Sequence, residues 1–461
     1  VELSWAVESK SKKNIKEISK FIKEKKPESI FLASDPDREG EAISWHLADE
    51  LDILDKKNVN RVVFHEITKN AILESFDNPK KIDMDLVDGY KARRVMDRIV
   101  GFETSAPLSS AIRVGGRATG RVQGPSLLIV NNREDEIQSH NALEYWSIKV
   151  DLTNKKNELV NAQLKGNKSK KDYFIFDVKK DKVIPIPDED SANALEEKLS
   201  KSEFKVLSIN KNKFKSKPRA PFTTSTLQQA ASSELRMAPR RTMDIAQELF
   251  RGIETGSKVL NLITYMRTDS TFISSEILGT IGQYVEKEYG HDYYSGTRVY
   301  SKSSKNSQEA HEAIRPTDIK NSPEKLKTQL NDQQYKLYKL IWDRTLGSQM
   351  KDSLSEKTTL TVEAKDNKKE ELLFESEYIE SVFDGFKILD LKQSYDKVPN
   401  LTTGEILKLE EIHKQKNFTR PKSRYTEASL IKELETSGIG RPSTYASIMD
   451  RIQYHKAVII L

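Results

Sequence analysis

The sequence predicts a multidomain protein of mixed class, with an α/β domain, a β-rich domain and helical domains. Three observations predict this class. The chain has 461 residues, and domains usually contain about 100–200 residues, so one core is not enough. Predicted helices and strands alternate near the N-terminus, which indicates a parallel sheet. Farther along, two strand-rich blocks flank a mainly helical segment, which indicates a β domain interrupted by an insertion.

Residues 14–76 read as an alternation of helices and strands. The apolar run at 30–33 predicts a strand that leads into a helix-patterned stretch at 41–51. A second short strand, 61–64, leads into a second helix, 67–76. Because strands joined by helices usually lie parallel in one sheet, this stretch predicts an α/β domain.

Helical and β-rich patterns divide the rest of the chain. A helical period covers 84–100, and a basic, glycine-rich loop at 115–121 precedes another helical stretch, 122–137. A helix that begins near Tyr335 fits either of its neighbours, and we assign it to the β-rich part. The expected domains are an α/β domain at 1–82, a helical domain at 83–143 and 414–461, a β-rich domain at 144–213 and 335–413, and a second helical domain at 214–334.

Composition narrows the classes of function. Charged residues make up 32% of the chain and the net charge is +6, which suits a polyanionic partner. There is no cysteine, which excludes disulfides and cysteine-ligated zinc within these residues. No apolar run is long enough to span a bilayer and no signal peptide is apparent, so we expect a cytoplasmic protein without a membrane partner. A Gly-Lys-Ser/Thr phosphate loop is absent from the sequence, which argues against a nucleotide-driven motor.

The most informative motif is the acidic turn at 35–39, between the first predicted strand and its helix. Asp35, Asp37 and Glu39 crowd three carboxylates into five residues, at the carboxyl end of a strand where α/β sheets usually bind ligands. Like charges this close repel one another unless a cation lies between them. Hard oxygen ligands suit Mg²⁺. The alternative is a solvated acidic turn that caps the helix.

A second motif joins a tyrosine to an arginine. The segment that begins at Leu262 reads as a short strand, so Tyr265 and Arg267 should project to the same side. A guanidinium beside a phenol favours the phenolate and can bind a phosphate, and tyrosine can form a covalent intermediate. The alternative is a core tyrosine followed by a helix cap at Asp269 or Ser270.

Two further motifs contain polar groups that suit phosphate. His311 lies in a dense polar run, 308–317, and is a candidate phosphate contact or proton shuttle, or else the end of a surface helix. In 438–445, two glycines end one helix and Arg441 precedes the next. Free N–H groups, hydroxyls and an arginine there make a candidate phosphate site, with a plain connection between helices as the alternative.

Taken together, the blocks of sequence resemble bacterial DNA topoisomerase I, of the type IA topoisomerase family. The residues around Tyr265 and His311 resemble this group more than the related topoisomerase III. The chain begins after the strand that supplies a further Glu and Lys in the family, so we expect a fragment that lacks the start of its Toprim domain and the end of its helical base. The matching blocks are 35–43, 64–72, 92–98, 120–123, 221–230, 263–270, 308–317 and 438–447.

The resemblance implies a toroid of four domains: a Toprim α/β domain, a β-rich arch, a helical domain with the active tyrosine, and a helical base. It implies ATP-independent relaxation of negatively supercoiled DNA by a monomer associated with the bacterial nucleoid. Tyr265 would form a 5′-phosphotyrosine, Arg267 would bind the scissile phosphate, and Glu39 would act as acid or base. Asp35, Asp37 and Glu39 would hold Mg²⁺. The residues expected to bind the single-stranded segment are Arg38, Arg93, Arg94, Asp97, Arg98, Arg121, Gln123, His311, Arg441, Ser443 and Thr444.

Two rival functions stay open at this point. One is a Toprim-type, Mg²⁺-dependent nuclease or primase in which Tyr265 is structural. The other is a DNA-binding fragment without catalysis. The sequence also differs from the residues usual in the family at Gly124, where the family usually has Ser, and between 102 and 120.

Overall fold

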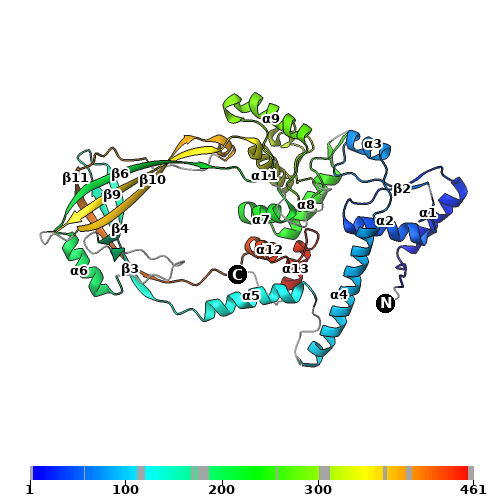
Figure 1. The fold of residues 1–461 in the computed structure, drawn as a ribbon, viewed down its shortest axis with the longest axis horizontal. Helices are drawn as coiled ribbons and strands as arrows, with labels where there is room; N and C mark the ends of the chain where they lie inside the picture. Colours follow the sequence, from blue (N-terminus) through cyan, green and yellow to red (C-terminus); the bar gives the residue numbers. More distant parts are fainter. Residues whose placement is uncertain are drawn as a thin grey trace.

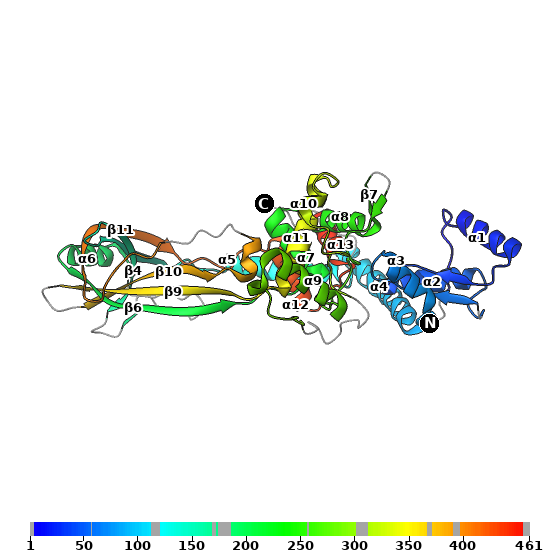
Figure 2. The ribbon, with the colours of Figure 1, turned by 90° about the horizontal axis from the view of Figure 1, so that it is seen from above.

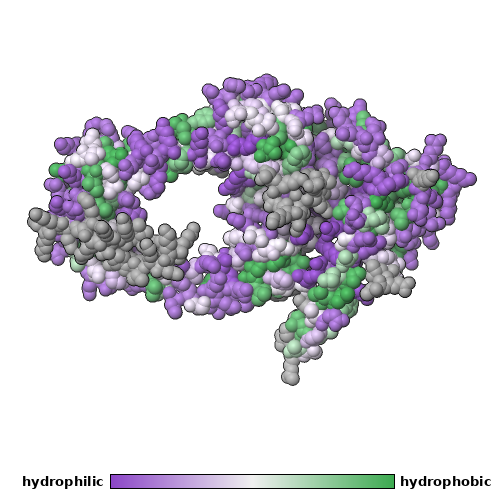
Figure 3. All heavy atoms as spheres, in the orientation of Figure 1, coloured by the Kyte–Doolittle hydropathy of each residue, from purple (hydrophilic) through white to green (hydrophobic). Residues whose placement is uncertain are grey.

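The described residues of the computed structural model are 4–56, 58–111, 120–167, 172–173, 186–255, 258–300, 312–366, 371–390 and 397–454. They form a ring in which a β-rich arch faces a group of helices, and the N-terminal α/β part lies outside the ring (Figure 1). Figure 3 shows an opening through the molecule between the arch and the helices. Seen from above, the three parts follow one another along the long axis (Figure 2). The toroid expected from the sequence is present.

The N-terminal part has the predicted α/β order. Strand β1 (Ile30–Leu32) pairs with β2 (Val59–Arg61) in parallel, as expected. A small core of Leu32, Ala48, Ile53 and Val59 lies between the strands and helix α2. The helices are α1 (Lys12–Lys25), α2 (Arg38–Glu50) and α3 (Lys69–Asp77).

The base of the ring is helical in the residues that the structure describes. Helix α4 (Met84–Ala111) packs against α2 and then projects away from the body (Figure 1). Helix α5 (Gln123–Gln138) leads towards the arch, and α12 (Glu427–Thr436) packs on α13 (Tyr445–Tyr454). Their shared core contains Leu430, Ile431, Leu434, Tyr445, Ile448, Met449 and Ile452.

The arch is an antiparallel sheet with the strand order β10-β9-β6-β11-β3-β4-β5. Strand β10 also pairs with β4, so the sheet curls back on itself. Buried and partly buried residues alternate along most of β9, which directs one face to a core of its own. The elements are β3 (Glu144–Thr153), β4 (Leu159–Asn167), β5 (Asp172–Tyr173), α6 (Glu189–Leu199), β6 (Glu203–Ser216), β9 (Ser353–Lys365), β10 (Glu371–Phe383) and β11 (Ile406–Phe418).

The segment between the two halves of the arch is mainly helical, as predicted. Its core contains buried side chains from several helices together with Phe222 and Tyr265. None of the helices in the described ranges is both long and apolar enough to cross a membrane. The elements are α7 (Thr224–Leu235), α8 (Pro239–Arg251), β7 (Ile253–Thr255), β8 (Lys258–Leu260), α9 (Ser275–Tyr289), η1 (His291–Tyr293), α10 (Pro323–Leu326) and α11 (Asp332–Gln349). The short helix η2 (Gly385–Leu389) follows β10 in the chain and packs against this same core.

Helix α11 corrects one predicted boundary. We assigned the chain from 335 onward to the β-rich part, but Leu337, Tyr338 and Trp342 of α11 are buried in the same core as Tyr265. A helical period shows that a helix has an apolar face, but it does not show which core receives that face. By packing, α11 belongs with the helical segment.

Candidate active site

The acidic turn lies between β1 and α2, as the sequence predicts. Asp37 is the N-cap residue of α2, and its Oδ1 accepts a hydrogen bond from the Gly40 amide at 2.8 Å. A Cβ atom on Gly40 would lie 2.0 Å from the carbonyl oxygen of Asp35, so only glycine fits this turn. The turn is therefore both a helix cap and a cluster of carboxylates, and the two interpretations are compatible.

A buried ion pair that the sequence analysis did not identify supports this turn. Arg61 is 1% exposed, and its Nε donates to Oε2 of Glu41 at 2.8 Å. The same guanidinium donates to the carbonyl oxygens of Asp35, Leu32 and Val62. Because Arg61 ends β2 and Glu41 lies in α2, this pair fixes the turn relative to the sheet. Its sequence signal was an arginine inside a predicted strand.

Tyr265 is brought to the acidic turn from the helical segment. Its hydroxyl donates to Oδ2 of Asp37 at 2.7 Å and lies 3.5 Å from Oδ2 of Asp35. The side chain is 2% exposed, and its backbone amide donates to the carbonyl oxygen of His65 at 2.8 Å. Burial and the negative charge of Asp37 raise the pKa of the Tyr265 hydroxyl well above its ordinary value. In this arrangement the hydroxyl is protonated and donates its hydrogen to Asp37.

Arg267 lies on the same side as Tyr265, as predicted. Its Nη1 lies 3.5 Å from Oδ2 of Asp37. The positive charge of Arg267 lowers the pKa of Tyr265, but burial and Asp37 outweigh it. Arg267 therefore acts in the expected direction, towards the phenolate, but it does not determine the net shift of the Tyr265 pKa.

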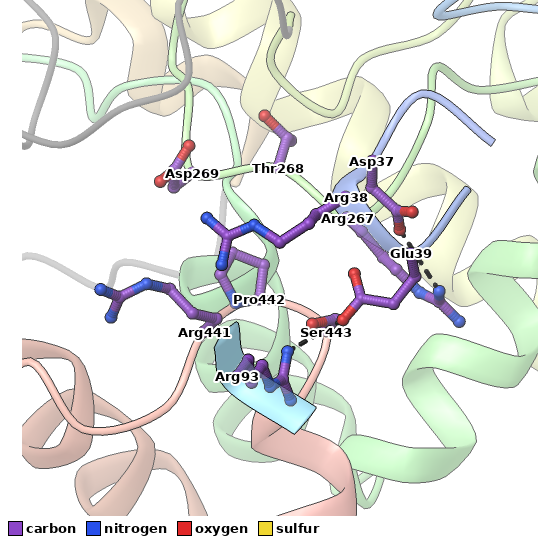
Figure 4. Close-up of a pocket in the computed structure, with 10 residues that line it drawn as sticks. All are labelled: Asp37, Arg38, Glu39, Arg93, Arg267, Thr268, Asp269, Arg441, Pro442 and Ser443. Carbon is purple, nitrogen blue, oxygen red and sulfur yellow. Dashed lines mark hydrogen bonds and ion pairs between the residues drawn. The ribbon is translucent and has the colours of Figure 1, made fainter. Parts of the chain in front are cut away.

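Asp37 and Arg267 line a pocket of about 90 Å³ where distant stretches of the chain meet (Figure 4). Ion pairs join Asp37 to Arg267 and Glu39 to Arg93, the second at 2.9 Å. We call this meeting point the junction. Its lining residues are Asp37, Arg38, Glu39, Arg93, Arg267, Thr268, Asp269, Arg441, Pro442 and Ser443.

The other predicted DNA-binding residues lie on α4, at the start of α5, in the turn before α5 (Arg121) and in the turn before α13, except His311, which lies outside the described residues. Asp97 pairs with Arg93 at 3.8 Å and with Arg121 at 2.9 Å. Gly440 has φ +83°, which suits glycine, and it precedes the turn that Thr444 closes by accepting from the Arg441 amide. Arg94 and Arg98 follow Arg93 on α4, and Gln123 begins α5.

Phe102 is an exposed aromatic residue on α4 that the sequence analysis did not single out. Its side chain is 67% exposed, and the guanidinium carbon of Arg98 lies 5.0 Å from the ring centroid. An exposed aromatic face beside a guanidinium is a surface on which a base can stack. The signal was present in the sequence as an apolar residue one turn after Arg98.

The carboxylates of the turn suit Mg²⁺ by their chemistry, but they already have partners here. Asp37 binds Gly40 and Tyr265, and Glu39 binds Arg93. Among the described residues, the group of three whose ligand atoms all lie within 4.8 Å of one another is a different one: Asp151, Glu411 and His413 of the arch. The tyrosine hydroxyl lies against Oδ2 of both Asp35 and Asp37, so a cation bound to these two atoms would compete with it.

Comparisons with known proteins agree with this architecture. Residues 81–459 match a family described as DNA topoisomerase, and residues 4–67 match the Toprim domain. DNA topoisomerase 1 of Rickettsia typhi is 40% identical over 99% of this chain, and that of Rickettsia bellii is 42% identical over 98%. The chain spans 58% and 56% of the lengths of these relatives. The solved structure of full-length topoisomerase I from Thermotoga maritima is 35% identical, with a TM-score of 0.81, and the match covers 98% of this chain and 70% of that one.

Proposed function

The chain belongs to the bacterial type IA DNA topoisomerase family, and we propose that it relaxes negatively supercoiled DNA by cutting and rejoining one strand without ATP. The observation that carries the proposal is the position of the Tyr265 hydroxyl. It lies 2.7 Å from Oδ2 of Asp37, and Asp37 lines a pocket together with four arginines. A nucleophile, a proton acceptor and phosphate-binding groups thus meet at one place.

In the proposed reaction, the Tyr265 oxygen attacks a backbone phosphorus and the 3′-oxygen leaves, so that the phosphate stays on the tyrosine as a 5′-phosphotyrosine. Asp37, which accepts the hydroxyl hydrogen bond, is placed to take the phenolic proton. Glu39 is assigned to protonate the leaving 3′-oxygen. Arg267 is assigned to the scissile phosphate, where its charge stabilises the negative charge of the transition state. Attack by the 3′-hydroxyl reverses the step, so no external energy source is needed.

We assign Mg²⁺ to Asp35, Asp37 and Glu39. The Toprim match and the oxygen donors support this assignment. When bound, the ion supplies positive charge close to the phosphate that reacts. Arg93 holds Glu39 in the closed arrangement and would release it towards the ion.

We assign the path of the single strand to α4 and the turn before α13. Arg93 and Arg441 line the pocket, and Arg98 with Phe102 extends the path along α4. Arg38, Arg94, Asp97, Arg121, Gln123, His311, Ser443 and Thr444 complete the proposed contacts. We further propose that the protein works as a monomer in the bacterial cytoplasm, uses no nucleotide, and is divided into the four domains expected from the sequence, with α11 moved to the tyrosine domain.

Trapping on end-labelled single-stranded DNA tests this function. After the protein is mixed with DNA and denatured, a label on the 3′ end should move with the protein, whereas a label on the 5′ end should appear on a shorter free strand. Free fragments with neither label on protein would indicate a nuclease. Bound but uncut DNA would indicate a binding protein without catalysis.

A further inference from the structure

Residues 65–67 of the N-terminal part dock onto the helical segment that carries Tyr265. The carbonyl oxygen of His65 accepts from the Tyr265 amide at 2.8 Å. Ile67 packs against the helical core. Between them, Oε2 of Glu66 accepts from Nη2 of Arg315 at 2.9 Å, and the two side chains are 18% and 3% exposed. This short segment therefore holds the tyrosine on the acidic turn.

The proposed reaction requires this docking to come apart and form again. Tyr265 is 2% exposed, and its hydroxyl is bound to Asp37. A phosphodiester cannot reach the hydroxyl of a side chain this deeply buried, so the N-terminal part and the helical segment must separate to admit DNA. Separation of a buried ion pair usually costs several kcal/mol when it leaves a charge without a partner.

The contacts of Glu66 and Arg315 remove this obstacle. Arg315 also donates to Glu312 on its own side of the interface, from Nε to Oε2 at 3.1 Å, and to the carbonyl oxygen of Pro316. Glu66 also accepts from the Thr68 hydroxyl on its own side, at Oε1 and 2.9 Å. Each charged group therefore keeps a local partner after the two parts separate.

We propose that Glu66 and Arg315 form a reversible latch that positions Tyr265, with Glu312 as the partner that receives Arg315 when the latch opens. This inference rests on the proposed function, because that function is what requires opening. It predicts opposite effects of two similar substitutions. Glu66→Gln weakens only the closed state, whereas Glu312→Gln weakens mainly the open state, in which Arg315 has lost Glu66.

The absence of cysteine allows specific labelling for a distance measurement. Helix α3 belongs to the N-terminal part and α9 to the helical segment (Figure 1). Spin labels attached to the cysteines of a Glu74→Cys, Gln283→Cys double variant therefore report the distance between the two parts. Glu66→Gln should raise the open-to-closed ratio about tenfold or more, the loss expected for one hydrogen bond between charged groups. Glu312→Gln, measured with single-stranded DNA present, should lower the ratio about threefold or more. Its amide oxygen can still accept from the Ser274 amide, so the local fold should persist.

Glu28→Gln is the matched control, since Glu28 is an exposed carboxylate of the same N-terminal part. It should leave the ratio unchanged, and circular dichroism should show that all three variants are folded. The latch is contradicted if both Glu66→Gln and Glu312→Gln behave like the control, or if both shift the ratio in the same direction. If the wild-type protein forms no covalent adduct with DNA, the proposed function is contradicted instead. The effect of Glu66→Gln on the open-to-closed ratio without DNA would still be measurable, so the two failures can be told apart.

Discussion

The junction and the arch both hold acidic side chains close together, but their surroundings differ. In the arch, Asp151, Glu411 and His413 lie on two neighbouring strands, with His413 Nε2 at 2.9 Å from Asp151 Oδ2. At the junction, Asp37 is 9% exposed and faces a tyrosine and an arginine from a distant stretch of the chain.

The difference shows what makes a site. In the arch, an imidazole and two carboxylates from adjacent strands satisfy one another, as side chains on a sheet surface often do. At the junction, the groups come from separate parts and include a nucleophile and several cations. We therefore base the proposed active site on the convergence of different chemical groups and not on the closeness of metal-ligating atoms.

The largest expected effect comes from removing the charges of the acidic turn. Asp35→Asn with Asp37→Asn keeps the size of both side chains and leaves an oxygen at position 37 to accept from Gly40. Mg²⁺-dependent relaxation of supercoiled DNA should fall at least about a hundredfold, since even indirect changes to metal sites cost 10–100-fold. His413→Ala in the arch should leave relaxation unchanged. Equal losses in both variants would erase the distinction between the two regions.

The buried support of the turn should matter more than a surface ion pair of the arch. Arg61→Leu leaves Glu41 buried without its cation, which should lower the local stability of α2 by about 3–5 kcal/mol. Lys357→Met removes an exposed partner of Glu377 and should change nothing measurable. Hydrogen exchange of the α2 and β9 amides measures both effects. Full protection of α2 in Arg61→Leu would show that this pair does not hold the turn.

The arginines of the junction should determine the salt dependence of DNA binding. In Arg93→Ala and Arg441→Ala, the slope of log affinity against log salt should decrease by roughly 0.7 for each phosphate that the protein no longer neutralises. Lys357→Ala in the arch serves as the control. Fluorescence anisotropy with labelled single-stranded DNA gives the slopes. An unchanged slope in both arginine variants would place the phosphate-binding groups elsewhere.

The smallest expected effect is a pH dependence of the arch. The hydrogen bond with Asp151 raises the pKa of His413 above 6.5; Glu411 raises it further and Lys149 opposes this. Since the pKa is higher in the folded state, this group contributes stability that is complete below about pH 6.5 and is lost as the pH rises through the folded value. His413→Gln should therefore abolish a slight decrease in arch stability above that pH. Thermal unfolding at several pH values measures this effect. The same dependence of the melting temperature on pH in the wild-type protein and in His413→Gln would contradict it.

The sequence was most informative where chemistry is local. Asp35, Asp37 and Gly40 lie within one turn, so their arrangement follows from strand, turn and helix signals alone. The two-residue spacing of Tyr265 and Arg267 in a predicted strand likewise predicted that they project to the same side. The core that receives α11 was not, because an amphipathic period does not specify the partner surface.

Contacts between distant parts of the chain could not be predicted from spacing. The pairs Arg61–Glu41 and Arg315–Glu66 join residues far apart in sequence, and each looks like an ordinary surface charge until the fold buries it. The same holds for the effect of Asp37 on Tyr265. The pKa of Tyr265 is raised by burial and by the hydrogen bond to Asp37, and both arise only when distant stretches of the chain meet in the fold.

Tyr265→Phe tests the central claim most directly, that the Tyr265 hydroxyl is the nucleophile. The substitution removes one oxygen and keeps the ring, which lies 5.4 Å from the ring of Phe250, so the fold and DNA binding should persist. In the trapping assay with 3′-labelled single-stranded DNA, the wild-type protein should carry the label and the Phe variant should carry none. A protein-linked label in the Phe variant would show that another group attacks the DNA, and the proposed active site would be wrong.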